Sequence, residues 1–244
     1  MSNLDLSQTV NDHSKLLERS LNHENVGVKM LAMEELDRVS KECPLAVNDI
    51  NLIIALIENL KCEETKIGNA LIDLLSKLLP KFITNTSIKK ILEETLKCRD
   101  IVRCRVYEIA TNIAKISAKQ LENVEFILDK MLNDLNNDDV LVQLNVLELF
   151  SQVALKEHGL VYLENKGVFA NVMKKIETID QSNLITKILI PGLMKFFGNI
   201  ASIHPLKVCN GYPTILSALF DCILSKDPSI LPTAFDTLGK LYLI

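Results

Sequence analysis

The chain has 244 residues, 48% of them hydrophobic, and carries 27 basic against 31 acidic side chains. This apolar content can offset the entropy of ordering the chain, which excludes disorder. The 8 glycines and 7 prolines are too few for an all-β fold rich in tight turns. The net charge is −4, whereas proteins that bind nucleic acid or coat anionic membranes carry an excess of basic residues. Neither class of partner is therefore expected.

No segment has the pattern of a secretory signal or a membrane span. The first residues combine no basic stretch with an apolar one, and the most apolar run, 52–60, contains Glu58 and Asn59. The six cysteines form no CxxC pair and have no histidine at ligand spacing, so we expect reduced thiols. These features predict a cytoplasmic protein, with the nucleus as a second compartment.

Taken in chain order, hydrophobic residues recur with helical spacing almost everywhere. Apolar stripes run over 28–39, 67–78 and 102–113, and the breaks between helices carry residues typical of caps, such as Asn25 and Asp100. The segment 159–169 has the pattern of a short helix closed by a glycine and followed at once by another. The chain is predicted to be all-α, with about twelve helices of roughly 10 to 18 residues in antiparallel pairs.

A short motif recurs near the ends of successive helices: apolar, any residue, polar, apolar, then small or apolar. Its central polar residues, called the polar row below, are Arg38, Lys77, Asn112, Gln152, Asn199 and Lys240. They are 35 to 47 residues apart, close to the roughly 40 to 47 residues of armadillo and HEAT repeats. Chance register among similar amphipathic helices is the alternative. The repeat predicts a HEAT/armadillo-like right-handed α-solenoid with the polar row on its inner surface.

The repeat also predicts a domain and a core. We expect residues 1–244 to form a single helical-repeat domain, the N-terminal part of a longer solenoid, because 238–244 is apolar where a terminal repeat needs a polar face. Asn112 and Asn199 are expected either to bond backbone groups of the adjacent repeat or to meet a partner. The residues expected between repeats are Val28, Leu36, Ile67, Leu74, Val106, Ile113, Val146, Val153, Phe197, Ile200 and Phe235.

Catalytic motifs do not rise above background in this sequence. The four histidines are scattered, and acidic pairs such as Glu34-Glu35 point about 100° apart on a helix, so they cannot flank one substrate bond. We expect no enzyme, no cofactor and no metal site. Basic residues gather once, at Lys97, Arg99, Arg103 and Arg105 beside Tyr107. A solvated helix start is the simplest interpretation, and a protein-docking patch is the alternative.

Several segments resemble the 26S proteasome non-ATPase regulatory subunit 5 family, which are proteasome base assembly chaperones. The similar segments are Asp100–Glu108, Asp138–Val142, Pro191–Ala201, Asp227–Ser229 and Phe235–Gly239. Residues 1–97 carry only the repeat pattern. The resemblance implies an adaptor that binds the C-terminal domain of an AAA ATPase subunit, 26S proteasome regulatory subunit 7, in the 19S regulatory particle base. Its bulk would delay docking of that ATPase on the 20S core.

The candidate partner-binding residues combine the polar row with the basic cluster and one matched lysine. They are Arg38, Lys77, Arg103, Arg105, Tyr107, Asn112, Gln152, Lys195, Asn199 and Lys240. An armadillo-type peptide-binding scaffold or transport adaptor is the alternative function. The absence of tryptophan argues against the transport receptors, whose grooves alternate Trp with Asn to hold a basic peptide.

Overall fold

The fold is a succession of packed helix pairs, as the sequence predicts. A computed structural model describes residues 3–43, 48–177 and 184–242, which contain helices and no strand. The chain divides into two compact units, Met1–Ile113 and Ala114–Ile244. Across the described residues, no helix combines the length and the apolar character needed to cross a membrane.

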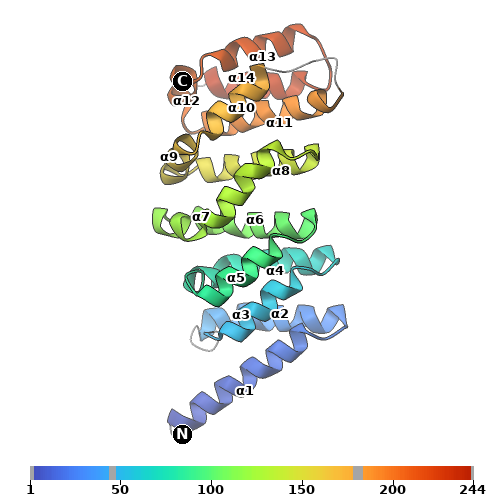
Figure 1. The fold of residues 1–244 in the computed structure, drawn as a ribbon, viewed down its shortest axis with the longest axis vertical. Coiled ribbons are helices and arrows are strands. Elements are labelled where there is room, and N and C mark those ends of the chain that lie inside the picture. Colours follow the sequence, from blue (N-terminus) through green and yellow to red (C-terminus); the bar gives the residue numbers. More distant parts are fainter. Residues whose placement is uncertain (1–2, 44–47, 178–183, 243–244) are drawn as a thin grey trace. The chain divides into compact units, whose positions relative to one another are not determined.

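The first unit consists of two layers of helices (Figure 1). First helices pack on second helices, as α1 does on α2 and α3 on α4, and like helices of successive repeats pack side by side, as α1 does on α3 and α2 on α4. The first helices are α1 (Asn3–Leu21), α3 (Ile50–Asn59) and α5 (Thr86–Thr95). The second helices are α2 (Val26–Glu42), α4 (Thr65–Leu78), which continues into the 3₁₀ turn η2 (Leu79–Lys81), and α6 (Asp100–Ala114).

The second unit repeats this plan, but two short helices precede each of its last two second helices. Its second helices are α8 (Val140–Ala154), α11 (Leu184–Ala201) and α14 (Leu231–Tyr242), and α11 packs on both of the others. Gly198 lets α14 approach α11 closely, since a Cβ there would lie 2.8 Å from the Thr237 hydroxyl. The other elements are α7 (Ala118–Asn133), η3 (Asp134–Asn136), α9 (Glu157–Asn165), α10 (Val168–Glu177), α12 (Pro205–Gly211) and α13 (Thr214–Leu224).

Short polar side chains start many of these helices. Asn25 accepts hydrogen bonds from the first backbone amides of α2, and Asp139 does the same for α8. Gly167, at φ +70°, separates α9 from α10 in the left-handed region that glycine favours, which confirms the short helix predicted there. The described residues form fourteen α-helices, more than the expected twelve, because α9, α10, α12 and α13 are short, with 7 to 11 residues each.

The apolar stripes form the core. Of the eleven residues expected inside, nine are buried: Leu36, Ile67, Leu74, Val106, Ile113, Val146, Val153, Phe197 and Ile200. Val28 is only half-buried, near the start of α2. The prediction for Phe235 is wrong, because its side chain is 55% exposed. Met33 and Leu147, which hold the same place in their repeats, are buried, whereas no described element packs over Phe235.

Candidate docking surface on the second helices

The polar row lies on the second helices, one residue to each. Arg38, Lys77 and Asn112 belong to α2, α4 and α6 of the first unit, and the other three residues belong to α8, α11 and α14 of the second. All six side chains are exposed or half-buried. Equivalent positions on packed, like-oriented helices fall on one face of each unit.

Three members of the polar row bond to the preceding second helix. Lys77 Nζ lies 2.8 Å from Asp37 Oδ1, Asn112 Nδ2 donates to Ser76 Oγ at 3.2 Å, and Asn199 Nδ2 donates to Ser151 Oγ at 3.1 Å. Each acceptor directly precedes a polar-row residue in the sequence. The two amides thus bond the adjacent repeat, one of the two alternatives expected, but their acceptors are side-chain hydroxyls and not backbone groups.

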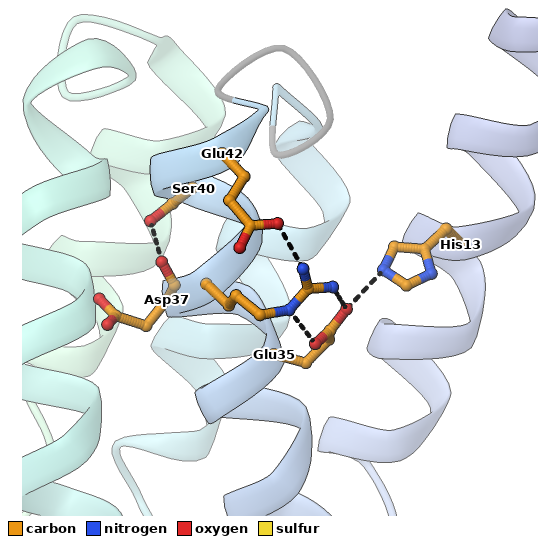
Figure 2. A network of polar contacts seen from close by, with 6 residues as sticks. His13, Glu35, Asp37, Ser40 and Glu42 are labelled. Atoms are coloured by element: carbon orange, nitrogen blue, oxygen red, sulfur yellow. Dashed lines mark hydrogen bonds and ion pairs between the residues drawn. The ribbon is translucent and has the colours of Figure 1, made fainter.

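Arg38 is held within its own helix. Its guanidinium donates to Glu35, at 2.6 Å between Nη2 and Oε1, and to Glu42, while His13 Nε2 from α1 lies 3.7 Å from Glu35 (Figure 2). The hydrogen bond from Arg38 lowers the pKa of Glu35, and Glu35 raises the pKa of Arg38. The positive charge of Arg38 is thus balanced by two carboxylates.

The other cations of the set are also paired with carboxylates. Lys77 and Lys41 both donate to Asp37, which lowers the pKa of that carboxyl group. Lys195 lies 2.7 Å from Glu148 across two helices, and Lys240 lies 2.7 Å from Asp236 one turn away. Gln152 accepts a hydrogen bond from Lys115 at 3.2 Å. The polar row therefore presents amides and balanced ion pairs.

The basic cluster does not form one surface. Arg105 is 6% exposed and Tyr107 is fully buried, so the structure corrects the docking role expected for both. Arg105 Nη1 reaches inward to the carbonyl oxygens of Leu60 and Cys62, and that pairing accounts for its burial. Lys97 and Arg99 are exposed, while Arg103 is half-buried and lies 2.7 Å from Asp100.

An acidic row that the motif did not include lies one turn before the polar row. Four residues before each polar-row member stand Glu34, Asp73, Glu108, Glu148, Lys195 and Asp236, five of them acidic. A fixed offset of four residues places both rows on one helix face. The spacing of four residues reveals this row in the sequence, whereas a motif of consecutive residues does not include it.

A groove opens between α2 and α4 on this face. Its volume is about 260 Å³, and its lining residues are Met30, Met33, Glu34, Asp37, Ala70, Asp73, Leu74 and Lys77. The second unit has a more open groove of about 590 Å³ between α7 and α9, lined in part by Leu121, Val161 and Tyr162. Within the described residues, no three His, Cys, Asp or Glu side chains gather as metal ligands.

Solved structures with similar folds are repeat proteins. The karyopherin Kap121p, bound to the SUMO protease Ulp1p, superposes on 96% of this chain with a TM-score of 0.70 at 11% identity, over 26% of its own length. A designed armadillo repeat protein in complex with the peptide (KR)4 covers 93% of this chain with a TM-score of 0.54 at 14% identity. These similarities establish the armadillo/HEAT-type fold.

Sequence comparison gives the family. The family model for the proteasome non-ATPase 26S subunit matches residues 1–243. The 26S proteasome non-ATPase regulatory subunit 5 of Drosophila melanogaster is 39% identical over 235 residues, 93% of this chain, and that of Homo sapiens is 29% identical over 92%. The chain spans 46% and 47% of the lengths of these two relatives. On this evidence the chain belongs to the 26S proteasome non-ATPase regulatory subunit 5 family.

Proposed function

We propose that this protein is a proteasome assembly chaperone that binds the C-terminal domain of an AAA ATPase subunit, 26S proteasome regulatory subunit 7. The 39% identity to the fly regulatory subunit 5 over 93% of the chain carries the proposal. The stacked second helices support it, because each unit offers a broad, rigid face on which a folded domain can dock. We place this docking face on the polar row of both units.

The mechanism we propose is steric. A helical-repeat body attached to the ATPase occupies the space that the 20S core would take, so the ATPase docks only after the chaperone leaves. This action requires no chemistry on the partner. The action depends on the affinity of the contact and on the bulk of the chaperone, and both can be measured.

The competing function, an armadillo-type scaffold for extended peptides, fits the side chains less well. A peptide-clamping row needs amides directed at the peptide backbone, whereas Asn112 and Asn199 donate to Ser76 and Ser151 of the neighbouring helix. The chain also has no tryptophan to stack between such amides. Both features support a folded domain as the partner.

Mixing the purified chain with the isolated C-terminal domain of the ATPase tests the proposal. We expect a stoichiometric complex in size-exclusion chromatography with light scattering, and we expect that complex to bind 20S core particles more weakly than the free ATPase domain does. The proposal fails if the folded domain elutes separately while unfolded peptides from the same domain bind. The same result would favour the peptide scaffold.

A further inference from the structure

The groove between α2 and α4 stands out because it combines apolar lining residues with two carboxylates, those of Glu34 and Asp73, that have no basic side chain within 4.0 Å among the described residues. Met30, Met33, Ala70 and Leu74 line its floor, and Glu34, Asp37 and Asp73 stand around it with Lys77. We infer that this groove is the docking site for a segment of the partner that presents a long apolar side chain beside a lysine or arginine. The choice of the ATPase as that partner rests on the proposed function.

The size of the groove fits a side chain. At about 260 Å³ it is smaller than the roughly 300 to 1,000 Å³ of small-molecule sites. Methionine side chains are unbranched and polarizable, so Met30 and Met33 can adapt to an apolar group that enters from outside. Met33 and Leu74 are buried at the base, while Met30 and Ala70 are half-buried. One or two large apolar side chains would fill this space.

The charges around the groove select a cation. Asp37 is shared by Lys41 and Lys77, so its charge is balanced. Glu34 and Asp73 are exposed, and among the described residues neither lies within 4.0 Å of a basic side chain. A partner that brings a lysine or arginine to this rim pairs with carboxylates that have no competing internal cation.

The second unit lacks this feature at the equivalent positions. There Glu148 is paired with Lys195 at 2.7 Å and Asp236 with Lys240 at 2.7 Å. The acidic row is thus neutralised on α8, α11 and α14, and two of its members, Glu34 and Asp73, are uncompensated on α2 and α4 of the first unit. Both units carry the polar row, but Glu34 and Asp73 of the first unit offer a basic segment carboxylates that are unpaired within the described part of the chain. We therefore expect such a segment to bind at the α2–α4 groove.

The test compares two neutralised variants of the 244-residue chain. E34Q/D73N removes the unpaired carboxylates at the groove. E58Q/E93Q removes two exposed carboxylates of the same unit from the first helices α3 and α5, with the same change in net charge. Association with the isolated ATPase C-terminal domain is followed by surface plasmon resonance. We expect E34Q/D73N to slow association roughly 3- to 10-fold at low salt, with the difference shrinking at high salt, and E58Q/E93Q to match the wild type.

A second readout locates the contact. The chain has six methionines, so methyl-labelled methionine gives a simple NMR spectrum in which Met30 and Met33 report on the groove and Met131, Met173 and Met194 do not. The probes are the ATPase domain and, separately, a short helical peptide with one lysine face and one leucine face. We expect both probes to shift the Met30 and Met33 resonances, and the shifts to weaken in E34Q/D73N.

Failure of the groove and failure of the proposed function give different results. If the ATPase domain binds but leaves Met30 and Met33 unmoved, and E34Q/D73N associates like E58Q/E93Q, the groove proposal is wrong and the chaperone proposal stands. If the ATPase domain does not bind but the lysine–leucine peptide shifts Met30 and Met33 in a way that depends on Glu34 and Asp73, the groove is supported and the ATPase is the wrong partner. If neither probe moves these resonances, the groove proposal is overturned.

Discussion

At the scale of single residues, Arg105 shows how a charged side chain can belong to the core. Its Nη1 donates to Leu60 O at 2.7 Å and to Cys62 O at 2.5 Å, carbonyls that follow the end of α3. Carbonyl groups at the C-terminal end of a helix carry partial negative charge and lack intrahelical partners, so a guanidinium both satisfies and attracts them. Gly68 leaves the space that the guanidinium occupies, because a Cβ there would lie 2.5 Å from Arg105 Cζ.

Replacing Arg105 by methionine should destabilise the first unit by about 2 to 4 kcal/mol, since two carbonyls lose a charged donor. The measurement is urea unfolding followed by circular dichroism. Gly68→Ala should also destabilise the wild type by displacing the guanidinium. In the Arg105→Met background, Gly68→Ala should be neutral or stabilising, because alanine favours a helix over glycine by about 1 kcal/mol. Additive effects of the two substitutions would refute the contact.

The sequence identifies the polar row but not what it bonds. The motif that contains Asn112 recurs at a regular spacing and is visible along the chain, whereas its acceptor, Ser76, lies 36 residues away and becomes a neighbour only when α4 and α6 stack. The sequence predicts an exposed Arg105 for the same reason, although the side chain is buried. Its position near a helix start suggests exposure, and its burial depends on carbonyls more than 40 residues earlier.

At the scale of elements, an aromatic cluster joins α10, α11 and the end of α12. Phe197 has its ring centroid 5.4 Å from Phe196, 6.1 Å from Phe169 and 5.7 Å from Tyr212, and it is fully buried. Phe169 and Tyr212 stack at 5.0 Å. Aromatic pairs at these distances contribute beyond the area that they bury.

Truncating Phe197 to alanine should cost about 3 to 5 kcal/mol, because a large side chain leaves a cavity that the surrounding helices cannot close. Phe235→Ala is the matched control. Its ring is 55% exposed, so we expect a loss below about 1 kcal/mol. Chemical denaturation of the two variants measures the difference. Similar losses for both would mean that Phe235 is packed in solution.

A polar network ties α7 to α9. Lys166, just after α9, lies 2.6 Å from Asp129 and 2.9 Å from Glu125, and the Tyr162 hydroxyl donates to Asp129 at 3.2 Å. Burial, followed by the charge of Asp129, raises the pKa of Tyr162, and hydrogen bonds to Asp129 and Glu125 raise the pKa of Lys166. Both groups are held in their protonated forms by the fold.

This network predicts a loss of stability in alkali. A group whose pKa is higher in the folded state stabilises the fold fully below its unfolded pKa and loses that contribution as the pH rises. For tyrosine and lysine the unfolded values are about 10. We expect the free energy of unfolding to fall above about pH 10, and to fall less steeply in Tyr162→Phe. Urea titrations at several alkaline pH values measure this, and equal slopes would contradict the assignment.

Several helices and most of the core could be predicted because they depend on local pattern. The stripe over 67–78 became α4, with Ile67 and Leu74 buried, and the glycine break at 167 separated two short helices. Phe235 could not be predicted in this way. It has the same periodic position as buried residues in earlier repeats, and its exposure depends on whether another helix lies over it.

At the scale of the whole molecule, the charge pattern of the second helices differs between the two units. Lys195 and Lys240 neutralise the acidic row in the second unit, whereas Glu34 and Asp73 of the first unit are exposed and have no basic side chain within 4.0 Å among the described residues. The chain has a net charge of −4. Two of its carboxylates, unpaired within the described residues, lie on the helix face that we propose as a docking surface. Charges on an interface rim mainly change the association rate.

Substituting Lys195 and Lys240 together by glutamine separates two roles for the second unit. If the lysines only balance Glu148 and Asp236, the double variant exposes two new carboxylates, and a basic partner should associate faster at low salt. We expect this result, because both lysines already lie 2.7 Å from their carboxylates. Association is measured with the ATPase domain, and melting should change little, since exposed ion pairs contribute about 0 to 1 kcal/mol. Slower association would show that the two lysines contact the partner directly. The surface of the partner that faces the second unit would then have to be acidic.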